Sequence, residues 1–254
     1  MKLGIVGKGG VGKTTTSALI AEAYTRRGQR VVAIDTDSNP NLGVSLGLTL
    51  DETEAMPVLP RALIVGTGGD GATASSLLTE YGRATPAGAT LLSAIKVTEA
   101  GAGCTCGGHA TVRSLLGSAL EEEADVALVD MEAGLEHLSR SGGTLAHADV
   151  LLVIMEPSRK SVITAARTVA LAEELGIPRT YAVGNKARLP DDAEFFADRC
   201  AEHSVPLAGV IPYSPDVIDA DRAGLRLASD SAEPVRAAIE QILSFLDGVM
   251  APTA

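Results

Sequence analysis

The amino-acid sequence predicts an α/β fold in which helices cover both faces of a doubly wound, mostly parallel sheet. Six short apolar runs, typical of buried strands, alternate with helix-like segments along the chain. Hydrophobic residues make up 46% of the 254 residues, yet only 3% are aromatic and Trp is absent. A core of Val, Ile, Leu and Ala is typical of such a three-layer fold, in which helices cover both faces of a parallel sheet. The strand-like runs are Leu3–Val6, Val31–Asp35, Val126–Asp130, Val150–Met155, Thr180–Gly184 and Leu207–Ile211.

Helical spacing is clearest in two segments between and after these runs. Ser161–Leu175 has apolar residues at helical spacing and ends before Gly176-Ile177-Pro178. Pro234–Val249 is expected to be a closing amphipathic helix. Residues 66–90 are small and polar at their start, which predicts a flexible surface excursion. Because no repeat or linker interrupts the pattern, we expect one domain over residues 1–254.

Charge and composition restrict the classes of partner. The chain has 21 basic and 32 acidic residues, a net charge of −11, which disfavours binding to nucleic acid or to anionic lipid. Its longest apolar run, Val150–Met155, is too short to span a membrane. Met1–Gly4 leads directly into the first strand without room for a signal peptide, and three cysteines fit a reducing compartment. We therefore expect a cytoplasmic protein that binds neither nucleic acid nor membrane.

The most informative motif is the glycine-rich run GKGGVGKT at residues 7–14. It fits the phosphate-binding pattern G-x-x-x-x-G-K-[ST], follows the strand Leu3–Val6 and precedes a helix-like segment. In such a P-loop, consecutive backbone N–H groups face one anion, and the helix N-terminus adds positive potential. Lys13 is expected to reach the β- and γ-phosphates, and the Thr14 hydroxyl to ligate Mg²⁺. The expected phosphate-binding residues are Gly7, Lys8, Gly9, Gly10, Val11, Gly12, Lys13, Thr14 and Thr15.

A second lysine in this loop, Lys8, narrows the class of P-loop protein. The sequence K-G-G-V-G-K-T resembles the deviant Walker A loop of the MinD/ParA/nitrogenase-iron-protein superfamily of P-loop NTPases (SIMIBI-like). In that superfamily the early lysine contacts phosphates across a dimer that encloses two nucleotides. The resemblance implies the same role for Lys8 and a homodimer as the active species. The alternative is a solvated loop lysine.

Two apolar strands end in carboxylates at the sheet edge where ligands bind. Asp35 and Asp37 form a D-x-D that resembles switch I of the superfamily, which implies that Asp37 positions the attacking water and Asp35 supports the Mg²⁺ shell or the loop. Alternatively, both cap the following turn, and the two roles are compatible. Asp130 and the residues after it resemble Walker B and switch II, which implies that Asp130 holds a Mg²⁺-bound water and that the Gly134 backbone senses the γ-phosphate. The implied reaction is ATP hydrolysis to ADP, with Lys8, Lys13, Asp37 and Asp130 as catalytic residues.

The base-reading segment is expected at Asn185-Lys186-Ala187-Arg188. Guanine-specific proteins have N-K-x-D here, because the carboxylate accepts hydrogen bonds from guanine. Arg188 stands in place of that Asp, and a guanidinium cannot accept a hydrogen bond. We therefore expect Asn185, with Lys186, to bind adenine and the nucleotide to be ATP. The turn Gly209–Tyr213 resembles the second base-binding turn of the superfamily, with Pro212 contributing backbone contacts.

A pair of cysteines, Cys104 and Cys106, lies in the glycine-rich segment 101–109, which we expect to be a metal-binding loop. One chain offers two thiolates, whereas a symmetric dimer offers four, enough for a complete metal site. The alternative is that the two cysteines are incidental small residues that bind no metal. His109 is close enough to join such a site, although a surface loop histidine is the default interpretation. Cys200, in the helix-like segment Ala193–Glu202, is expected to pack rather than to ligate.

The cysteine pair, the P-loop and the segment Asp130–Leu138 together resemble CooC-type accessory ATPases, which mature nickel-containing carbon monoxide dehydrogenase. The likeness extends from Met1 to Tyr213. In that family the paired cysteines bind nickel, or zinc in its place, at the dimer interface. The resemblance implies a homodimeric ATPase, with ATP or ADP, Mg²⁺ and Ni²⁺ or Zn²⁺ bound, that serves an apo nickel enzyme.

Two other functions fit the P-loop less well. A positioning or regulatory ATPase of the ParA/MinD kind acts on DNA or membrane through basic surfaces, but residues 231–254 contain only one basic residue, Arg236. A reductase like the nitrogenase iron protein needs a cluster-binding cysteine just after switch II, and residues 131–145 contain none. The sequence therefore favours a metal-delivery ATPase.

Overall fold

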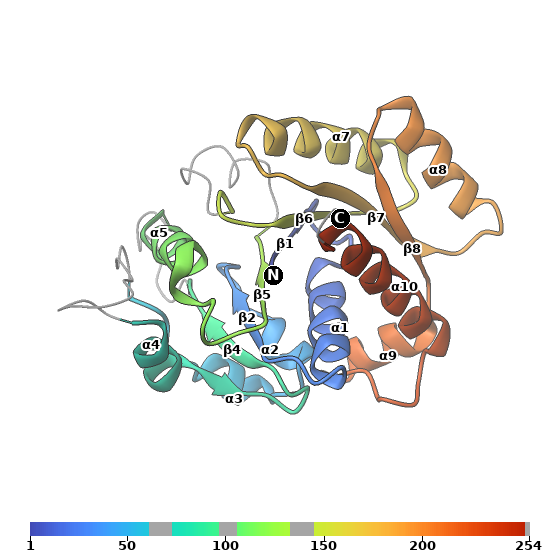
Figure 1. Cartoon of the computed structure of the whole chain (residues 1–254). Coiled ribbons are helices and arrows are strands. Elements are labelled where there is room, and N and C mark those ends of the chain that lie inside the picture. Colours follow the sequence, from blue (N-terminus) through green and yellow to red (C-terminus); the bar gives the residue numbers. More distant parts are fainter. Residues whose placement is uncertain (61–72, 97–105, 133–144, 252–254) are drawn as a thin grey trace.

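A computed structural model describes residues 1–60, 73–96, 106–132 and 145–251 (Figure 1). One eight-stranded sheet runs through them in the order β3-β4-β2-β5-β1-β6-β7-β8, and all neighbouring pairs except β3 with β4 are parallel. This confirms the predicted fold class. The strands are β1 (Lys2–Gly7), β2 (Val31–Asp35), β3 (Arg83–Ala84), β4 (Thr90–Ser93), β5 (Val126–Asp130), β6 (Val150–Met155), β7 (Thr180–Ala187) and β8 (Leu207–Pro212).

Helices cover both faces of the sheet, and each face has its own hydrophobic cluster. Figure 1 shows α7 and α8 on one side of β6 and β7, with α1 and α10 on the other. The first face packs against α4 (Ala74–Tyr81), α5 (Cys106–Ser114), the π-helical turn Leu115–Ala119, α7 (Arg159–Glu174) and α8 (Asp192–Glu202). The second packs against α1 (Lys13–Arg26), α2 (Leu42–Ser45) and α10 (Glu233–Met250), while α3 (Leu50–Glu54) and α9 (Pro215–Arg222) are short connecting helices.

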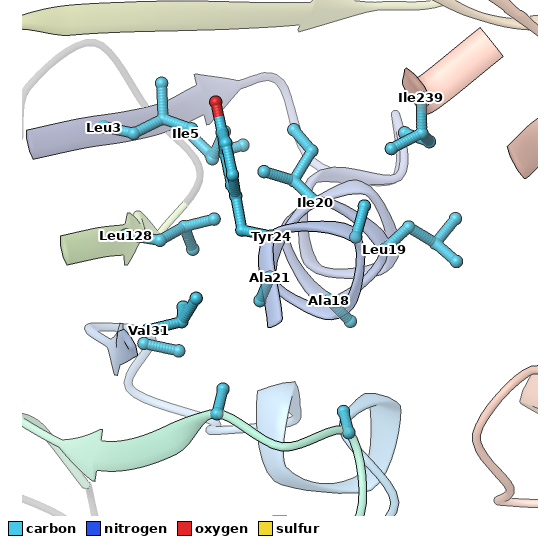
Figure 2. Close-up of a cluster of buried hydrophobic side chains, with 14 of the residues drawn as sticks. Leu3, Ile5, Ala18, Leu19, Ile20, Ala21, Tyr24, Val31, Leu128 and Ile239 are labelled. Atoms are coloured by element: carbon cyan, nitrogen blue, oxygen red, sulfur yellow. The ribbon is translucent and has the colours of Figure 1, made fainter. Parts of the chain in front are cut away.

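Helix α1, which follows the P-loop, is anchored deep in the second cluster. Figure 2 shows Tyr24 extending from α1 between Leu128 of β5 and Ile20, toward Ile5 of β1. These four side chains are at most 1% exposed. Burying a large aromatic or branched side chain contributes about 1.5–3 kcal/mol. The packing therefore fixes the position of α1, and with it the loop before its first residue.

The closing helix α10 is amphipathic as expected. Val235, Ile239 and Ile242 are buried, and the Phe245 ring contacts Tyr181 edge-on with centroids 4.9 Å apart. Within the residues described, no helix is long and apolar enough to cross a membrane.

The main departure from the sequence analysis lies between residues 73 and 90. Helix α4, strand β3 and the start of β4 occupy this part of the range in which we expected a surface excursion. Strand β4 pairs in parallel with β2, from Val32 opposite Thr90 to Asp35 opposite Ser93, so it is an integral part of the sheet. Residues 61–72 lie outside the described residues. A single domain over 1–254 stays a prediction.

Candidate nucleotide site

The glycine-rich loop lies between β1 and α1 at the carboxyl edge of the sheet. Gly10 and Gly12 have φ values of 80° and 95°, which glycine adopts far more readily than other residues. A Cβ on Gly12 would also collide with the Asn185 side-chain amide. Since α1 begins at Lys13, its N-terminal N–H groups face the same loop. The loop has the backbone form that an anion site requires.

We expect Gly12→Ala to lower ATP affinity at least about tenfold, because the new methyl group displaces Asn185 or distorts the loop. Isothermal titration calorimetry measures the effect. Gly28→Ala is the matched control: Gly28 has a φ of 81° but open space around it. That variant should lose about 1 kcal/mol of stability and bind ATP normally. Equal loss of affinity in both variants would contradict the steric argument.

The predicted magnesium residues meet in the structure. The Thr14 hydroxyl donates a hydrogen bond of 2.7 Å to Asp130 Oδ2. The Ser17 hydroxyl donates one of 2.9 Å to Asp130 Oδ1, so both carboxylate oxygens of Asp130 are oriented by α1. Ser17 was not predicted from the sequence. Its place one helical turn after Thr14, on the same face, was the available signal.

Asp35 and Asp37 have different surroundings. Asp35 is buried, and its two oxygens accept hydrogen bonds from the backbone N–H groups of Asp37 (3.0 Å) and Leu42 (2.9 Å). Asp37 lines the cavity described below, and its Oδ1 accepts a hydrogen bond of 2.9 Å from the Asn39 N–H. Of the roles left open for Asp35, these contacts favour organisation of the loop.

Burial governs the electrostatics of this edge. It raises the pKa of Asp35, and the nearby Asp130 carboxylate raises it further. Burial also raises the pKa of Asp130, against the hydrogen bonds from Thr14 and Ser17. Burial lowers the pKa of Lys13, against the charges of Asp130 and Asp37. A divalent cation would relieve this excess of buried acidic groups, so the residues present fit Mg²⁺ held by Thr14 and, through water, by Asp130.

A cavity of about 350 Å³ opens beside the loop, within the usual range for small-molecule sites. Its lining combines polar groups of the P-loop, Asp37, Lys186 and Asp221 with the apolar side chains of Leu19, Ile211, Pro212, Tyr213, Val217, Ile218 and Val235. A lining of this kind suits both the phosphates and the base of a nucleotide.

Two side chains of the base-reading segment also donate hydrogen bonds to the P-loop. These contacts were not predicted from the sequence. The Asn185 Nδ2 donates to the Val11 carbonyl at 2.7 Å, and the Lys186 Nζ donates to the Gly10 carbonyl at 2.6 Å. The Lys186 N–H in turn donates to Asn185 Oδ1 at 2.8 Å. The amide of Asn185 keeps a second N–H and a lone pair for a ligand. That it reads adenine stays a prediction.

The Arg188 side chain packs on Tyr213 and offers a bound base no hydrogen-bond acceptor. Its guanidinium carbon lies 3.9 Å from the ring centroid of Tyr213, a cation–π contact beside the cavity. The Asp192 carboxylate accepts hydrogen bonds from the backbone N–H groups of Arg188 (2.6 Å) and Leu189 (2.8 Å), which fixes this turn.

We expect ATP to bind at least about tenfold more tightly than GTP, since Arg188 offers guanine no acceptor. Calorimetric titration of both nucleotides checks this. The Arg188→Asp variant places a carboxylate acceptor at this position, so the ratio of ATP affinity to GTP affinity should fall. Equal affinity of the unaltered protein for both nucleotides would disprove the base-specificity argument.

Of the remaining predicted residues, some lie within the described part of the chain and others outside it. Lys8 is exposed on the loop, and its carbonyl accepts a hydrogen bond of 3.4 Å from Lys13 Nζ. Gly134 and Cys104 lie outside the described residues. No group of three or more His, Cys, Asp or Glu suited to a metal occurs in the part of the chain that the structure describes.

The described part of the cysteine segment is helical. Helix α5 begins at Cys106, so residues 106–109 form its first turn and not the end of a loop. His109, on this helix, is 1% exposed and is therefore not the surface histidine of the default interpretation. Cys200 is buried in α8 within the first cluster, as expected for a packing residue.

Comparison with known proteins agrees with this site. Residues 5–227 match the family described as the CobQ/CobB/MinD/ParA nucleotide binding domain. The carbon monoxide dehydrogenase accessory protein CooC of Rhodospirillum rubrum is 36% identical over 238 residues, which cover 89% of this chain and 88% of that protein. An uncharacterized ATP-binding protein of Methanocaldococcus jannaschii is 32% identical over 259 residues, which cover 97% of each.

Solved structures of low sequence identity share the fold. A chain of the MinC:MinD cell division protein complex of Aquifex aeolicus has a TM-score of 0.71 at 21% identity, covering 100% of this chain and 98% of that chain. MinD of Pyrococcus horikoshii OT3, complexed with Mg-ADP, has a TM-score of 0.68 at 18% identity and covers 99% of both chains. The chain therefore belongs to the CobQ/CobB/MinD/ParA nucleotide-binding family and, within it, to the CooC-type carbon monoxide dehydrogenase accessory proteins.

Proposed function

We propose that this protein is a dimeric ATPase that binds nickel through Cys104 and Cys106 of both subunits and delivers it to an apo nickel enzyme such as carbon monoxide dehydrogenase. The observation that carries the proposal is the 36% identity to CooC over 88% of that protein's length. Nickel is the cargo in this proposal, and zinc can occupy the same site.

The nucleotide site supports the hydrolytic half of the proposal. Mg²⁺, when bound, neutralises charge on the phosphates. Lys13 contacts the β- and γ-phosphates, while Thr14 and Ser17 hold Asp130 in place. Asp37, at the wall of the cavity, orients the attacking water. These assignments put the chemistry at the carboxyl edge of β2 and β5.

The metal half of the proposal depends on thiolate chemistry. Four thiolates, two from each subunit, complete a tetrahedral site of the kind that zinc prefers. ATP-driven closure of the dimer brings the two pairs together, and hydrolysis or docking of the client releases the ion.

We expect Lys8→Ala to abolish ATP-linked dimerisation while changing the ATP affinity of the monomer by less than about threefold, because Lys8 contacts the partner's nucleotide. Light scattering coupled to gel filtration, with and without ATP, measures the oligomer. The control is Lys13→Ala in the same loop, which should lose nucleotide binding outright. A Lys8→Ala protein that still dimerises on ATP would disprove the cross-dimer role.

Metal stoichiometry and client activation test the proposed function together. We expect one nickel or zinc per dimer by elemental analysis. The nickel-loaded protein with ATP should activate apo carbon monoxide dehydrogenase. A non-hydrolysable ATP analogue in place of ATP should not support repeated rounds of activation. Absence of both metal binding and activation would disprove metal delivery and leave a ParA/MinD-type switch ATPase as the function.

A further inference from the structure

Helix α7 concentrates exposed positive charge on an otherwise acidic protein. Its first two residues are Arg159 and Lys160, Arg167 follows two turns later, and no acidic residue occurs before Glu173. In α8, α9 and α10, by contrast, acidic residues outnumber basic ones. The chain as a whole has a net charge of −11, so the charge of α7 before Glu173 is opposite in sign to that of the chain.

The charges at the start of α7 are unfavourable for the helix itself. A helix N-terminus carries partial positive charge, and acidic residues stabilise it there, whereas cations do the reverse. The start of α7 is nevertheless well defined, since the N-cap Ser158 Oγ accepts a hydrogen bond of 3.3 Å from the Ser161 N–H. Neither Arg159, Lys160 nor Arg167 forms an ion pair with any carboxylate of the described residues. Local folding therefore gives no reason for cations at this position.

An apolar side chain lies among these charges. Arg159, Ile163 and Arg167 follow one another at a spacing of four, so they share one face of the helix. Ile163 is 41% exposed, while Val162 and Val169 are buried against the sheet. The exposed face therefore combines cations with an apolar centre over about 12 Å, at 1.5 Å per residue.

This composition fits a protein partner better than a polyanion. Protein interfaces place apolar contacts at the centre and polar groups at the rim, with Arg enriched. Nucleic acids and anionic bilayers are bound by many cations over a long surface, and three on a protein of net charge −11 supply few such contacts.

The chain enters α7 from the strand that neighbours the P-loop strand. Strand β6, which precedes α7, pairs with β1 so that Ile154 lies opposite Gly7 of the P-loop. Residues 156–158 alone separate β6 from α7. A partner seated on the first turn of α7 would therefore lie one strand away from Lys8 and the phosphates.

We propose that the exposed face of α7, defined by Arg159, Lys160, Ile163 and Arg167, docks an acidic, partly apolar patch on the client protein. The identity of the client, apo carbon monoxide dehydrogenase, rests on the proposed function. The positive charge of this face selects an acidic surface on the partner. Because α7 follows β6, which pairs with the P-loop strand β1, docking is linked to whether ATP is bound.

The test is a binding titration of the full-length protein, with Mg²⁺ and ATP, against apo carbon monoxide dehydrogenase by biolayer interferometry. We expect Arg159→Glu/Lys160→Glu to weaken binding at least about tenfold, and binding of the unaltered protein to weaken as salt increases. ATP affinity should stay unchanged, and the Tm should hold or rise, because glutamates suit a helix N-terminus. The matched control is Arg26→Glu/Arg83→Glu, the same change of charge at exposed residues on α1 and β3. This variant should bind the apo-enzyme normally.

The outcomes separate the two proposals. If the Arg159→Glu/Lys160→Glu protein binds and activates the apo-enzyme like the unaltered protein, the docking surface is wrong and the proposed function stands. If the unaltered protein neither binds nor activates the apo-enzyme, both proposals fail. Binding instead to duplex DNA or to phosphatidylglycerol vesicles, lost in the α7 variant, would overturn the protein-docking proposal in favour of a polyanion.

Discussion

The Asp37→Asn variant is expected to bind ATP with nearly unchanged affinity and to hydrolyse it at least about a hundredfold more slowly, the usual contribution of a positioned acid or base. In the proposed mechanism the carboxylate orients the attacking water and accepts its developing proton, and an amide does this poorly. Binding should persist because the phosphates are held by the P-loop, whose contacts do not involve Asp37. Single-turnover hydrolysis and calorimetry separate the two effects. The variant should also accumulate as the ATP-bound dimer.

Glu132→Gln is a matched control for this change. Glu132 lies two residues after Asp130, and its Oε1 accepts a hydrogen bond of 2.7 Å from the Ser38 hydroxyl. A glutamine oxygen can accept the same bond, so hydrolysis should stay within about threefold of the unaltered protein. Normal turnover by Asp37→Asn would transfer the water-positioning role to another carboxylate.

Most of the sheet could be predicted because buried parallel strands are continuous apolar runs. Val31–Asp35, Val126–Asp130 and Val150–Met155 are fully buried, and their observed bounds are the predicted ones. Strand β4 was missed, since its four residues, TLLS, are too few to give a period. Its place in the sheet comes from pairing with β2, a contact between distant segments that local patterns do not encode.

The same limit applies to the nucleotide site. The P-loop and the strand-end carboxylates were predictable because strand, loop and helix follow each other in the chain. Hydrogen bonds join Asn185 to Val11 and Lys186 to Gly10. The paired residues are more than 170 positions apart in the sequence, so no local motif predicts these contacts. The stacking of Arg188 on Tyr213 was missed for the same reason. Motifs give the residue types of a site, and tertiary packing gives their contacts.

The double change Cys104→Ser/Cys106→Ser is expected to eliminate tight nickel and zinc binding, and with it any metal-driven dimerisation, while ATP binding is retained. A serine hydroxyl is a far weaker ligand than a thiolate for these ions. Losing even one cysteine per chain leaves two thiolates per dimer, too few to close the site. Equilibrium dialysis with nickel, alongside calorimetry with ATP, measures both properties. Full nickel affinity in the double variant would remove the main support for metal delivery.

The third cysteine provides a control within the same chain. Cys200 is 2% exposed, and burial raises the pKa of its thiol to about 11, so it stays largely protonated and unreactive at neutral pH. Cys200→Ala should therefore leave nickel stoichiometry unchanged, and alkylation of the native protein should be confined to Cys104 and Cys106 and be blocked by the metal. Because thiolates are the proposed ligands, protons should compete with nickel, and the nickel affinity should fall as the pH is lowered. Alkylation of Cys104 and Cys106 that nickel does not block, or affinity that does not change between pH 8 and about pH 6, would show that nickel is held by groups other than this pair.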